Sequence, residues 1–210
     1  MLRLTLVRHG ITEWNRLGRW QGHTDTELSP EGERQARQLG RRWQGRRFDR
    51  VYSSDLRRAH RTAELALPDA EIILEPRLRE VSFGEFDGKT EQENRLHPLF
   101  ADWAADPYRS PAPGGESLED LLIRLLPWVS ELEDGLDVVA FSHSCTLRTL
   151  ISHLVRLPME PREGRIWPFV ITTPHTSVSV LERSGSDWSL VRLADDAHLE
   201  PAFAPQETPA

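Results

Sequence analysis

Short strand-like runs alternate with stretches of helical periodicity along most of this chain. Residues 4–7, 48–52, 72–74 and 137–141 have the length and character of buried strands. Between them, apolar residues recur every three or four positions, as they do on one face of a helix. This alternation predicts an α/β fold, a three-layer sandwich in which helices cover both faces of a mostly parallel central sheet.

Three of the predicted helices begin at recognisable signals. Ser29 is an N-cap candidate followed by Pro30 at the first helical position. Residues 53–55 are expected to open the next helix, and residues 117–120 resemble a capping box in which Asp replaces the usual Glu or Gln. Pro127 is expected to kink this third helix or to mark a turn in it. Its apolar face consists of Leu118, Leu121, Leu122, Leu125, Val129 and Leu132.

The remaining segments complete the predicted domain. Residues 178–181 and 188–191 flank a Ser-Gly-Ser-Asp turn, which indicates a β-hairpin and hence an antiparallel edge of the sheet. The irregular stretch 84–115 is interpreted as a small, partly helical cap over the crevice at the end of the sheet, with a linker as the alternative. We therefore predict one domain over residues 1–200, followed by a disordered tail at 201–210 that is rich in Pro and Ala.

Composition narrows the possible partners. The 210 residues carry a net charge of −7, so no overall basic field favours nucleic acid. No stretch approaches the roughly 20 apolar residues of a membrane span, and the N-terminus lacks a signal-peptide pattern, which predicts a cytoplasmic protein. Cys145 is the only cysteine, which excludes an internal disulfide, and no ligand cluster suggests a metal or another cofactor.

Two predicted strands end in histidine. Arg8-His9-Gly10 follows the first strand, and Ser142-His143-Ser144 follows the strand at 137–141. Parallel strands open their carboxyl ends on the same edge of a sheet, where ligands bind. If the two strands are neighbours, His9 and His143 face one crevice. Histidine there can act as a base, a ligand or a nucleophile, and Arg8 supplies planar donors for an anion.

Two further charged residues follow other strands. Arg58 lies in the first turn of a predicted helix, where helix N–H groups and a guanidinium both favour anions, whereas Arg57 must point elsewhere. Glu80 follows the third strand, and a carboxylate near a crevice can be a general acid. Taken alone, Arg58 is as consistent with a surface charge, and Glu80 with an ion-pair partner of Arg77 or Arg79.

Seven segments together resemble, in the same order, the histidine phosphatase superfamily, the group related to cofactor-dependent phosphoglycerate mutase. The resemblance covers residues 2 to about 155 and extends more loosely to the hairpin. The segments are residues 6–15, 21–22, 28–32 with 35–36, 53–62, 78–84, 115–117 and 141–143.

The resemblance implies phosphoryl transfer through a covalent phosphohistidine. His9 would be the nucleophile, and Arg8, Arg58 and His143 would surround the phosphoryl oxygens. Glu80 would protonate the leaving oxygen and then activate water. The substrate contacts predicted in addition are Asn15, Gln21, Gly22 and Ser144. The family commonly has small residues, often Gly-Gly, where this chain has Ser144 and Cys145, and Cys145 is expected to start a helix rather than to act as a second nucleophile.

The insert favours one activity within this family. The family's mutases carry a longer, basic insert, whereas this one contains acidic residues, namely Glu91, Glu93, Asp102 and Asp106. We therefore expect a phosphomonoesterase that acts on a small phosphorylated metabolite, such as phosphoglycerate, a sugar phosphate or α-ribazole phosphate. The alternatives are phosphoryl transfer of the phosphoglycerate mutase type and a catalytically silent phosphate-binding module. Specificity is expected to come from the cap, and analogy with the family suggests a homodimer.

Overall fold

The computed structural model of the protein describes residues 1–199, and the predicted tail at 201–210 lies outside the described residues. Six strands form one sheet in the order β3-β2-β4-β1-β5-β6. The first four are mutually parallel, whereas β5 runs antiparallel to β1 and β6 antiparallel to β5. The strands are β1 (Leu2–Arg8), β2 (Arg50–Ser53), β3 (Ile72–Leu74), β4 (Asp137–Ser142), β5 (Val178–Ser184) and β6 (Asp187–Asp195).

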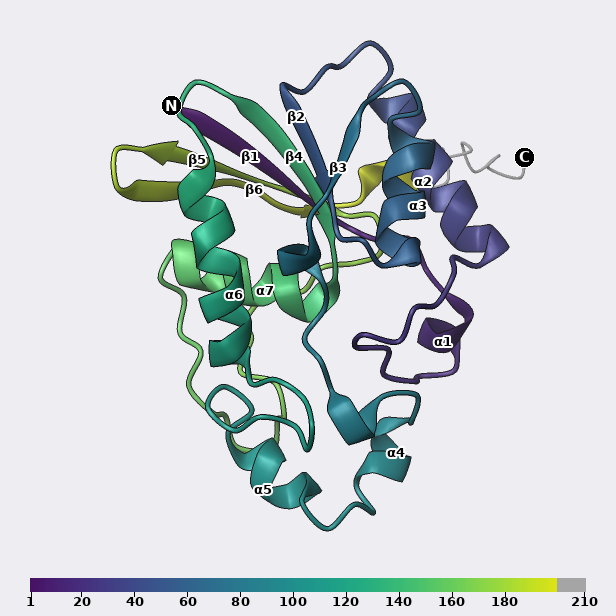
Figure 1. The fold of residues 1–210 in the computed structure, drawn as a ribbon, viewed down its shortest axis with the longest axis vertical. Coiled ribbons are helices and arrows are strands. Elements are labelled where there is room, and N and C mark those ends of the chain that lie inside the picture. Colours follow the sequence, from purple (N-terminus) through teal and green to yellow (C-terminus); the bar gives the residue numbers. More distant parts are fainter. Residues whose placement is uncertain (200–210) are drawn as a thin grey trace, which may run out of the picture.

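Helices cover both faces of the sheet, which confirms the predicted three-layer α/β fold (Figure 1). On one face lie α2 (Pro30–Arg42) and α3 (Arg57–Ala66), and on the other lie α6 (Leu118–Glu131) and α7 (Ser144–Leu154). Shorter elements are α1 (Glu13–Arg16), α4 (Glu91–Asn94), α5 (Phe100–Ala105) and three 3-10 turns at Pro76–Leu78, Gly84–Phe86 and Ala197–Leu199.

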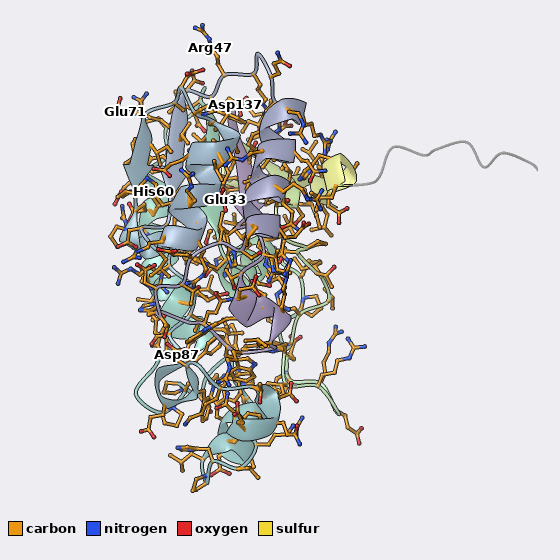
Figure 2. The ribbon with its side chains drawn as sticks, turned by 90° about the vertical axis from the view of Figure 1, so that its right-hand side faces the viewer. Glu33, Arg47, His60, Glu71, Asp87 and Asp137 are labelled. Atoms are coloured by element: carbon orange, nitrogen blue, oxygen red, sulfur yellow. The ribbon has the colours of Figure 1, made fainter. Side chains whose placement is uncertain are left out.

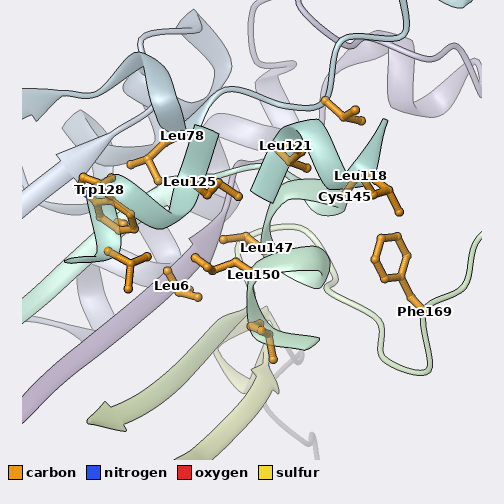
Figure 3. Close-up of a cluster of buried hydrophobic side chains, with 14 of the residues drawn as sticks. Leu6, Leu78, Leu118, Leu121, Leu125, Trp128, Cys145, Leu147, Leu150 and Phe169 are labelled. Atoms are coloured by element: carbon orange, nitrogen blue, oxygen red, sulfur yellow. The ribbon is translucent and has the colours of Figure 1, made fainter. Parts of the chain in front are cut away.

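The strands distribute their apolar side chains between two cores. Successive residues of a strand point to opposite faces, so Val138 and Ala140 face α6 and α7 while Val139 and Phe141 face α2 and α3. Figure 3 shows the first core, where leucines of α6 meet leucines of α7 above Leu6 of β1. Both faces of β4 are therefore buried, as expected for the centre of a parallel sheet.

Two of the three predicted helix starts are confirmed. The Ser29 side chain accepts a hydrogen bond from the Gly32 backbone N–H, with Pro30 at the first helical position. Ser117 and Asp120 form the reciprocal contacts of a capping box at the start of α6. The carboxylate of Asp120 is long enough to replace the usual Glu because it reaches the Ser117 backbone N–H directly.

Some details of the helices and strands differ from the prediction. Helix α3 begins at Arg57 without a side-chain cap, because Ser54 instead accepts the Leu56 backbone N–H and forms a turn before the helix. Strand β2 covers 50–53 rather than 48–52. Helix α6 continues through Pro127 to Glu131, so the proline marks no turn. The next two side chains, Trp128 and Val129, are buried, and their packing favours continued helix over the loss of one N–H donor.

Residues 84–115 lie beyond the carboxyl ends of the parallel strands (Figure 1). The segment contains α4 and α5, which agrees with its expected partly helical character, and its aromatic rings pack around Trp20. Figure 2 shows Asp87 of this segment well below Glu33 of α2 and His60 of α3. Whether the segment acts as a cap stays a prediction. Among residues 1–199, no helix combines the length and the apolar character that crossing a membrane requires.

Candidate active site

The sheet order brings the two strand-end histidines together. Strands β1 and β4 are adjacent and parallel, with Arg8 opposite Ser142 in the register. The next residues along both strands are therefore neighbours, and the ring centroids of His9 and His143 lie 5.1 Å apart. Both rings are buried. The two rings are therefore neighbours, as expected, but only His9 also lines the cavity described below.

The hydrogen bond of His9 determines which of its nitrogens can react. Its Nδ1 lies 2.7 Å from the carbonyl oxygen of Gly10 and must donate, since a carbonyl only accepts. In the neutral ring, Nε2 then carries the lone pair. Burial and the positive charges of Arg58 and Arg8 lower the pKa of His9 well below its usual value, which keeps the ring neutral. Gly10 is needed here because a Cβ would lie 2.5 Å from the Gly32 carbonyl oxygen.

We expect the imidazole of His9 to remain neutral, with its proton on Nδ1, at pH 6. The lowered pKa means that the lone pair on Nε2 stays available below pH 6.5, where an ordinary histidine becomes protonated. Imidazole 15N chemical shifts distinguish the two tautomers and the imidazolium ion, and a His9→Asn variant assigns the resonances. An imidazolium signal from His9 in the ligand-free protein at pH 6 would contradict this assignment.

Arg58 is fixed by three contacts. It is buried at the second position of α3, and its guanidinium donates to the carbonyl oxygens of Thr24 and Gly22 at 2.8 and 2.7 Å and to His143 Nδ1 at 3.2 Å. Burial lowers its pKa to about 10, so it stays charged at neutral pH. Arg57 points outward and pairs with Asp25, as the sequence predicts for one member of this pair.

Arg8 is held from the segment before β5. Its Nη1 donates to the Thr173 carbonyl oxygen at 2.7 Å and its Nη2 to His175 Nε2 at 2.9 Å, while its buried Nε has no partner among residues 1–199. Burial and the nearby Arg8 lower the pKa of His175 to about 3, so this ring is a neutral acceptor. His175 therefore orients Arg8.

The contacts of His143 differ from those expected of a phosphoryl ligand. Its Nδ1 accepts from Arg58 and its Nε2 lies 2.9 Å from the Ser54 hydroxyl, so both ring nitrogens are occupied. Burial, which contributes most, and the charge of Arg58 lower its pKa well below the usual value. In this structure the ring aligns Arg58 and packs against His9.

Glu80 is bound to the start of α7. Its Oε1 accepts from the Thr146 backbone N–H, the Thr146 hydroxyl and the Val81 N–H at 3.0–3.1 Å, and its Oε2 accepts from the Cys145 N–H at 3.1 Å. Helix N-termini stabilise such carboxylates. The alternative role as an ion-pair partner is wrong, because Arg79 pairs with Asp55 and Arg77 with acidic residues elsewhere.

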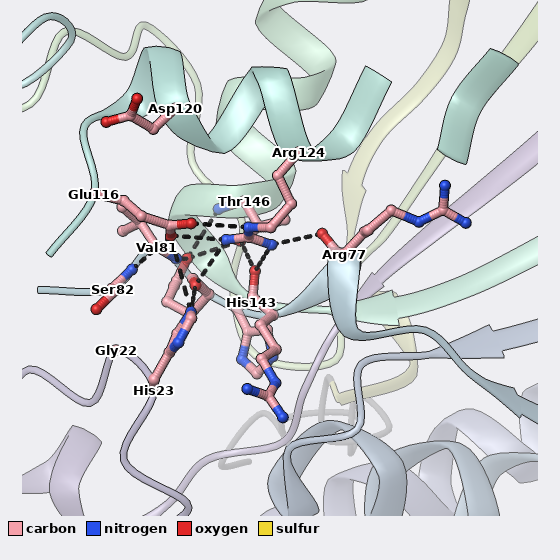
Figure 4. A network of polar contacts seen from close by, with 12 residues as sticks. Gly22, His23, Arg77, Val81, Ser82, Glu116, Asp120, Arg124, His143 and Thr146 are labelled. Carbon is pink, nitrogen blue, oxygen red and sulfur yellow. Dashed lines mark hydrogen bonds and ion pairs between the residues drawn. The ribbon is translucent and has the colours of Figure 1, made fainter. Parts of the chain in front are cut away.

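Arg124 of α6 fixes the backbone that carries Glu80 (Figure 4). It donates to the carbonyl oxygens of Arg77, Arg79 and Glu80 at 2.6–3.2 Å and binds both carboxylate oxygens of Glu116 at 2.9 Å. The Glu80 carbonyl oxygen also contacts His23 at 2.8 Å. Sequence reasoning missed Arg124, because an arginine within an amphipathic helix carries no signal that separates it from a surface charge.

A cavity of about 160 Å³ lies at the site, and His143 is not among the residues that line it. The four predicted substrate contacts Asn15, Gln21, Gly22 and Ser144 all line it, together with Arg8, His9, Arg19, Trp20, Arg58, Glu80, Phe83, Cys145, Arg148 and Trp167. The walls thus come from the loop after β1, the segment around Glu80, the start of α7 and Trp167. Among the described residues, the stretch 84–115 contributes no lining side chain, so the expectation that the cap sets specificity finds no support in the lining.

The residues predicted to contact the substrate have different surroundings in the structure. Gly22 has φ +44°, and a Cβ there would lie 2.1 Å from Asp87 Oδ1, so glycine is required. The side-chain amide oxygen Oε1 of Gln21 accepts from the Thr12 hydroxyl at 3.0 Å, and the Ser144 hydroxyl lies 3.3 Å from the Thr173 hydroxyl. Cys145 is buried, and burial raises its pKa to about 12, which agrees with a structural thiol.

The site can be compared with known proteins at this point. Residues 4–196 match the family described as the histidine phosphatase superfamily (branch 1). The chain belongs to this family. It is accordingly an enzyme of the histidine phosphatase type, as the resemblance implied.

Several relatives match most of the chain. A putative phosphoserine phosphatase 2 of Hydrogenobacter thermophilus is 31% identical over 205 residues, which is 94% of this chain and 98% of that protein. A probable phosphoglycerate mutase GpmB of Salmonella choleraesuis is 36% identical over 168 residues, or 75% and 77% of the two chains. The solved structure of a putative α-ribazole-5′-P phosphatase of Escherichia coli has a TM-score of 0.82 at 26% identity, covering 93% of this chain and 97% of that one.

Proposed function

We propose that the protein hydrolyses phosphate monoesters of small metabolites through a phosphohistidine formed on His9. The observation that supports this most directly is the neutral ring of His9, whose Nδ1 proton is committed to the Gly10 carbonyl and whose Nε2 lone pair is available. Relatives described as phosphatases support the same class of reaction.

The first step transfers the phosphoryl group. Nε2 of His9 attacks phosphorus, the Nε2–P bond forms, and the bond between phosphorus and the ester oxygen breaks. The buried cations Arg8 and Arg58 neutralise charge on the phosphoryl oxygens, and their prior bonds to backbone carbonyls mean that little reorganisation is needed. The Gly10 carbonyl stabilises the positive ring that results.

Glu80 serves both steps. In the first step, protonated Glu80 gives its proton to the departing ester oxygen and becomes a carboxylate. In the second step, that carboxylate takes a proton from water, the water oxygen bonds to phosphorus and the Nε2–P bond breaks, which releases inorganic phosphate and restores the lone pair of His9. Glu80 lines the cavity, and within residues 1–199 its Oε2 accepts one hydrogen bond, which leaves it capacity for a further proton or water.

We expect a phosphoenzyme to accumulate when a substrate with a good leaving group is mixed rapidly with the protein. Nε2 is the only nucleophile that the proposal uses, so the label should be stable in alkali, labile in acid and located on His9 by mass spectrometry. Rapid quenching after mixing with radiolabelled acetyl phosphate measures it. Phosphate release without any trapped label in wild type or in a slowly hydrolysing Glu80→Gln variant would exclude the covalent route.

Phosphoryl transfer of the mutase type is the second candidate, because a probable phosphoglycerate mutase is among the relatives. Hydrolase and mutase share the first step and differ in whether water or a second hydroxyl takes the phosphoryl group. Incubation with 3-phosphoglycerate separates them. We expect inorganic phosphate to appear, whereas conversion to 2-phosphoglycerate without phosphate release would favour the mutase.

A further inference from the structure

Arg148 is a cation of the cavity that the phosphoryl chemistry does not use. It lies on α7, one turn after Ser144, and is partly buried. Arg8 and Arg58 are tied to the backbone beside His9, whereas Arg148 is held on the side of the cavity where Trp167 lies. No carboxylate among residues 1–199 forms an ion pair with it.

Its guanidinium is held in a fixed orientation. Nε donates to the Ser144 carbonyl oxygen at 3.2 Å and Nη2 to Cys145 Sγ at 3.3 Å. The guanidinium carbon lies over the buried ring of Phe169, 4.3 Å from the ring centroid. Nη1 has no acceptor within the described part of the chain. The edge formed by Nη1 and the second N–H of Nη2 is therefore available to a planar anion.

The other arginine outside the phosphoryl site is committed elsewhere. Arg19 donates from Nη1 to the Gly88 carbonyl oxygen and lies 3.9 Å from the carboxylate of Glu93. Glu80, which is the one carboxylate lining the cavity among residues 1–199, is bound to the start of α7. Apart from Arg8 and Arg58, which the proposed chemistry uses, Arg148 is thus the cavity cation for which the described residues provide no ion-pair partner.

We propose that Arg148 binds a carboxylate on the leaving group, so that the substrate is a small phosphorylated carboxylic acid. This inference rests on the proposed phosphatase function. The two parallel N–H groups of a guanidinium match the two oxygens of a carboxylate, and the attraction between the two charges offsets solvation that the guanidinium loses on binding. The cavity of about 160 Å³ is smaller than the roughly 300–1,000 Å³ typical of sites for drug-sized ligands, which favours a short leaving group over a nucleoside or a sugar.

The test compares esters that differ in the carboxylate. Phosphoserine is matched with phosphoethanolamine, and 3-phosphoglycerate with glycerol 3-phosphate. We expect wild type to prefer the carboxylated member of at least one pair, and Arg148→Gln to lower kcat/KM for that member about 10- to 100-fold, the effect of a lost hydrogen bond to a charged group. For the carboxylate-free member the same substitution should change kcat/KM less than threefold. Arg148→Lys, which keeps the charge but not the fork, should fall between.

Each other outcome has a distinct meaning. An equal loss on both members of a pair would show that Arg148 contacts the phosphoryl group or only supports the fold, and would overturn the proposal. So would a wild-type preference for the carboxylate-free esters, or for a bisphosphate. If wild type releases phosphate from none of these esters nor from p-nitrophenyl phosphate, the proposed function itself fails. Arg41→Gln, an exposed change on α2, is the matched control, and thermal melting checks that each variant folds.

Discussion

Replacement of His9 by alanine is expected to lower the rate of phosphate release from p-nitrophenyl phosphate by about 10⁴-fold or more, as the loss of a catalytic nucleophile does in other enzymes. Nε2 of the imidazole forms the new bond to phosphorus, whereas the arginines beside it stabilise charge but supply no nucleophile. The loss should appear in kcat rather than in substrate affinity. Steady-state kinetics with protein at high concentration measures it.

The control must separate lost chemistry from a lost fold, because His9 is buried and alanine leaves a gap. His60→Ala removes a histidine that is partly exposed on α3, and it should keep wild-type activity. Binding of vanadate or inorganic phosphate to His9→Ala, followed by calorimetry, shows whether Arg8 and Arg58 still form an anion site. If His9→Ala melts like wild type and keeps activity within tenfold of wild type, His9 is not the nucleophile.

The topology could be predicted because its signals are local. Alternating strands and helices, two helix caps and a Gly-containing hairpin each lie within a few residues of sequence. The neighbouring positions of His9 and His143 followed from one further assumption, that β1 and β4 pair, and the sheet order confirms it. Boundaries were less accurate where a turn competed with a helix start, as at Ser54.

Contacts between distant segments could not be predicted in the same way. Arg8 is oriented by Thr173 and His175, and the carboxylate of Glu80 by Thr146, across more than 60 positions of sequence. No periodicity or motif connects such residues, and only the folded sheet edge brings them together. His143 illustrates the same limit, since its ring nitrogens are engaged by Arg58 and Ser54.

Replacement of Glu80 by glutamine is the second change with a large expected effect, and its size should depend on the leaving group. Glutamine can accept hydrogen bonds from Thr146 but can neither give a proton to the ester oxygen nor take one from water. For an alkyl phosphate, whose leaving oxygen needs the proton, we expect kcat/KM to fall by about 10²- to 10⁴-fold. p-Nitrophenolate leaves without that help, so kcat/KM for p-nitrophenyl phosphate should fall much less.

The same variant also tests the second role of Glu80. If the carboxylate activates water, loss of it slows hydrolysis of the phosphohistidine, so p-nitrophenyl phosphate should give a rapid burst of nitrophenol followed by a slow steady rate. Stopped-flow absorbance measures both phases. Glu80→Asp is the matched variant: it keeps a carboxylate that can transfer a proton but shortens the reach to Cys145 and Thr146. It therefore tests the position of the carboxylate, whereas Glu80→Gln tests its proton transfer. If Glu80→Gln lowers kcat/KM equally for both classes of ester and shows no burst, Glu80 only supports the start of α7. The proton donor would then be another group that lines the cavity.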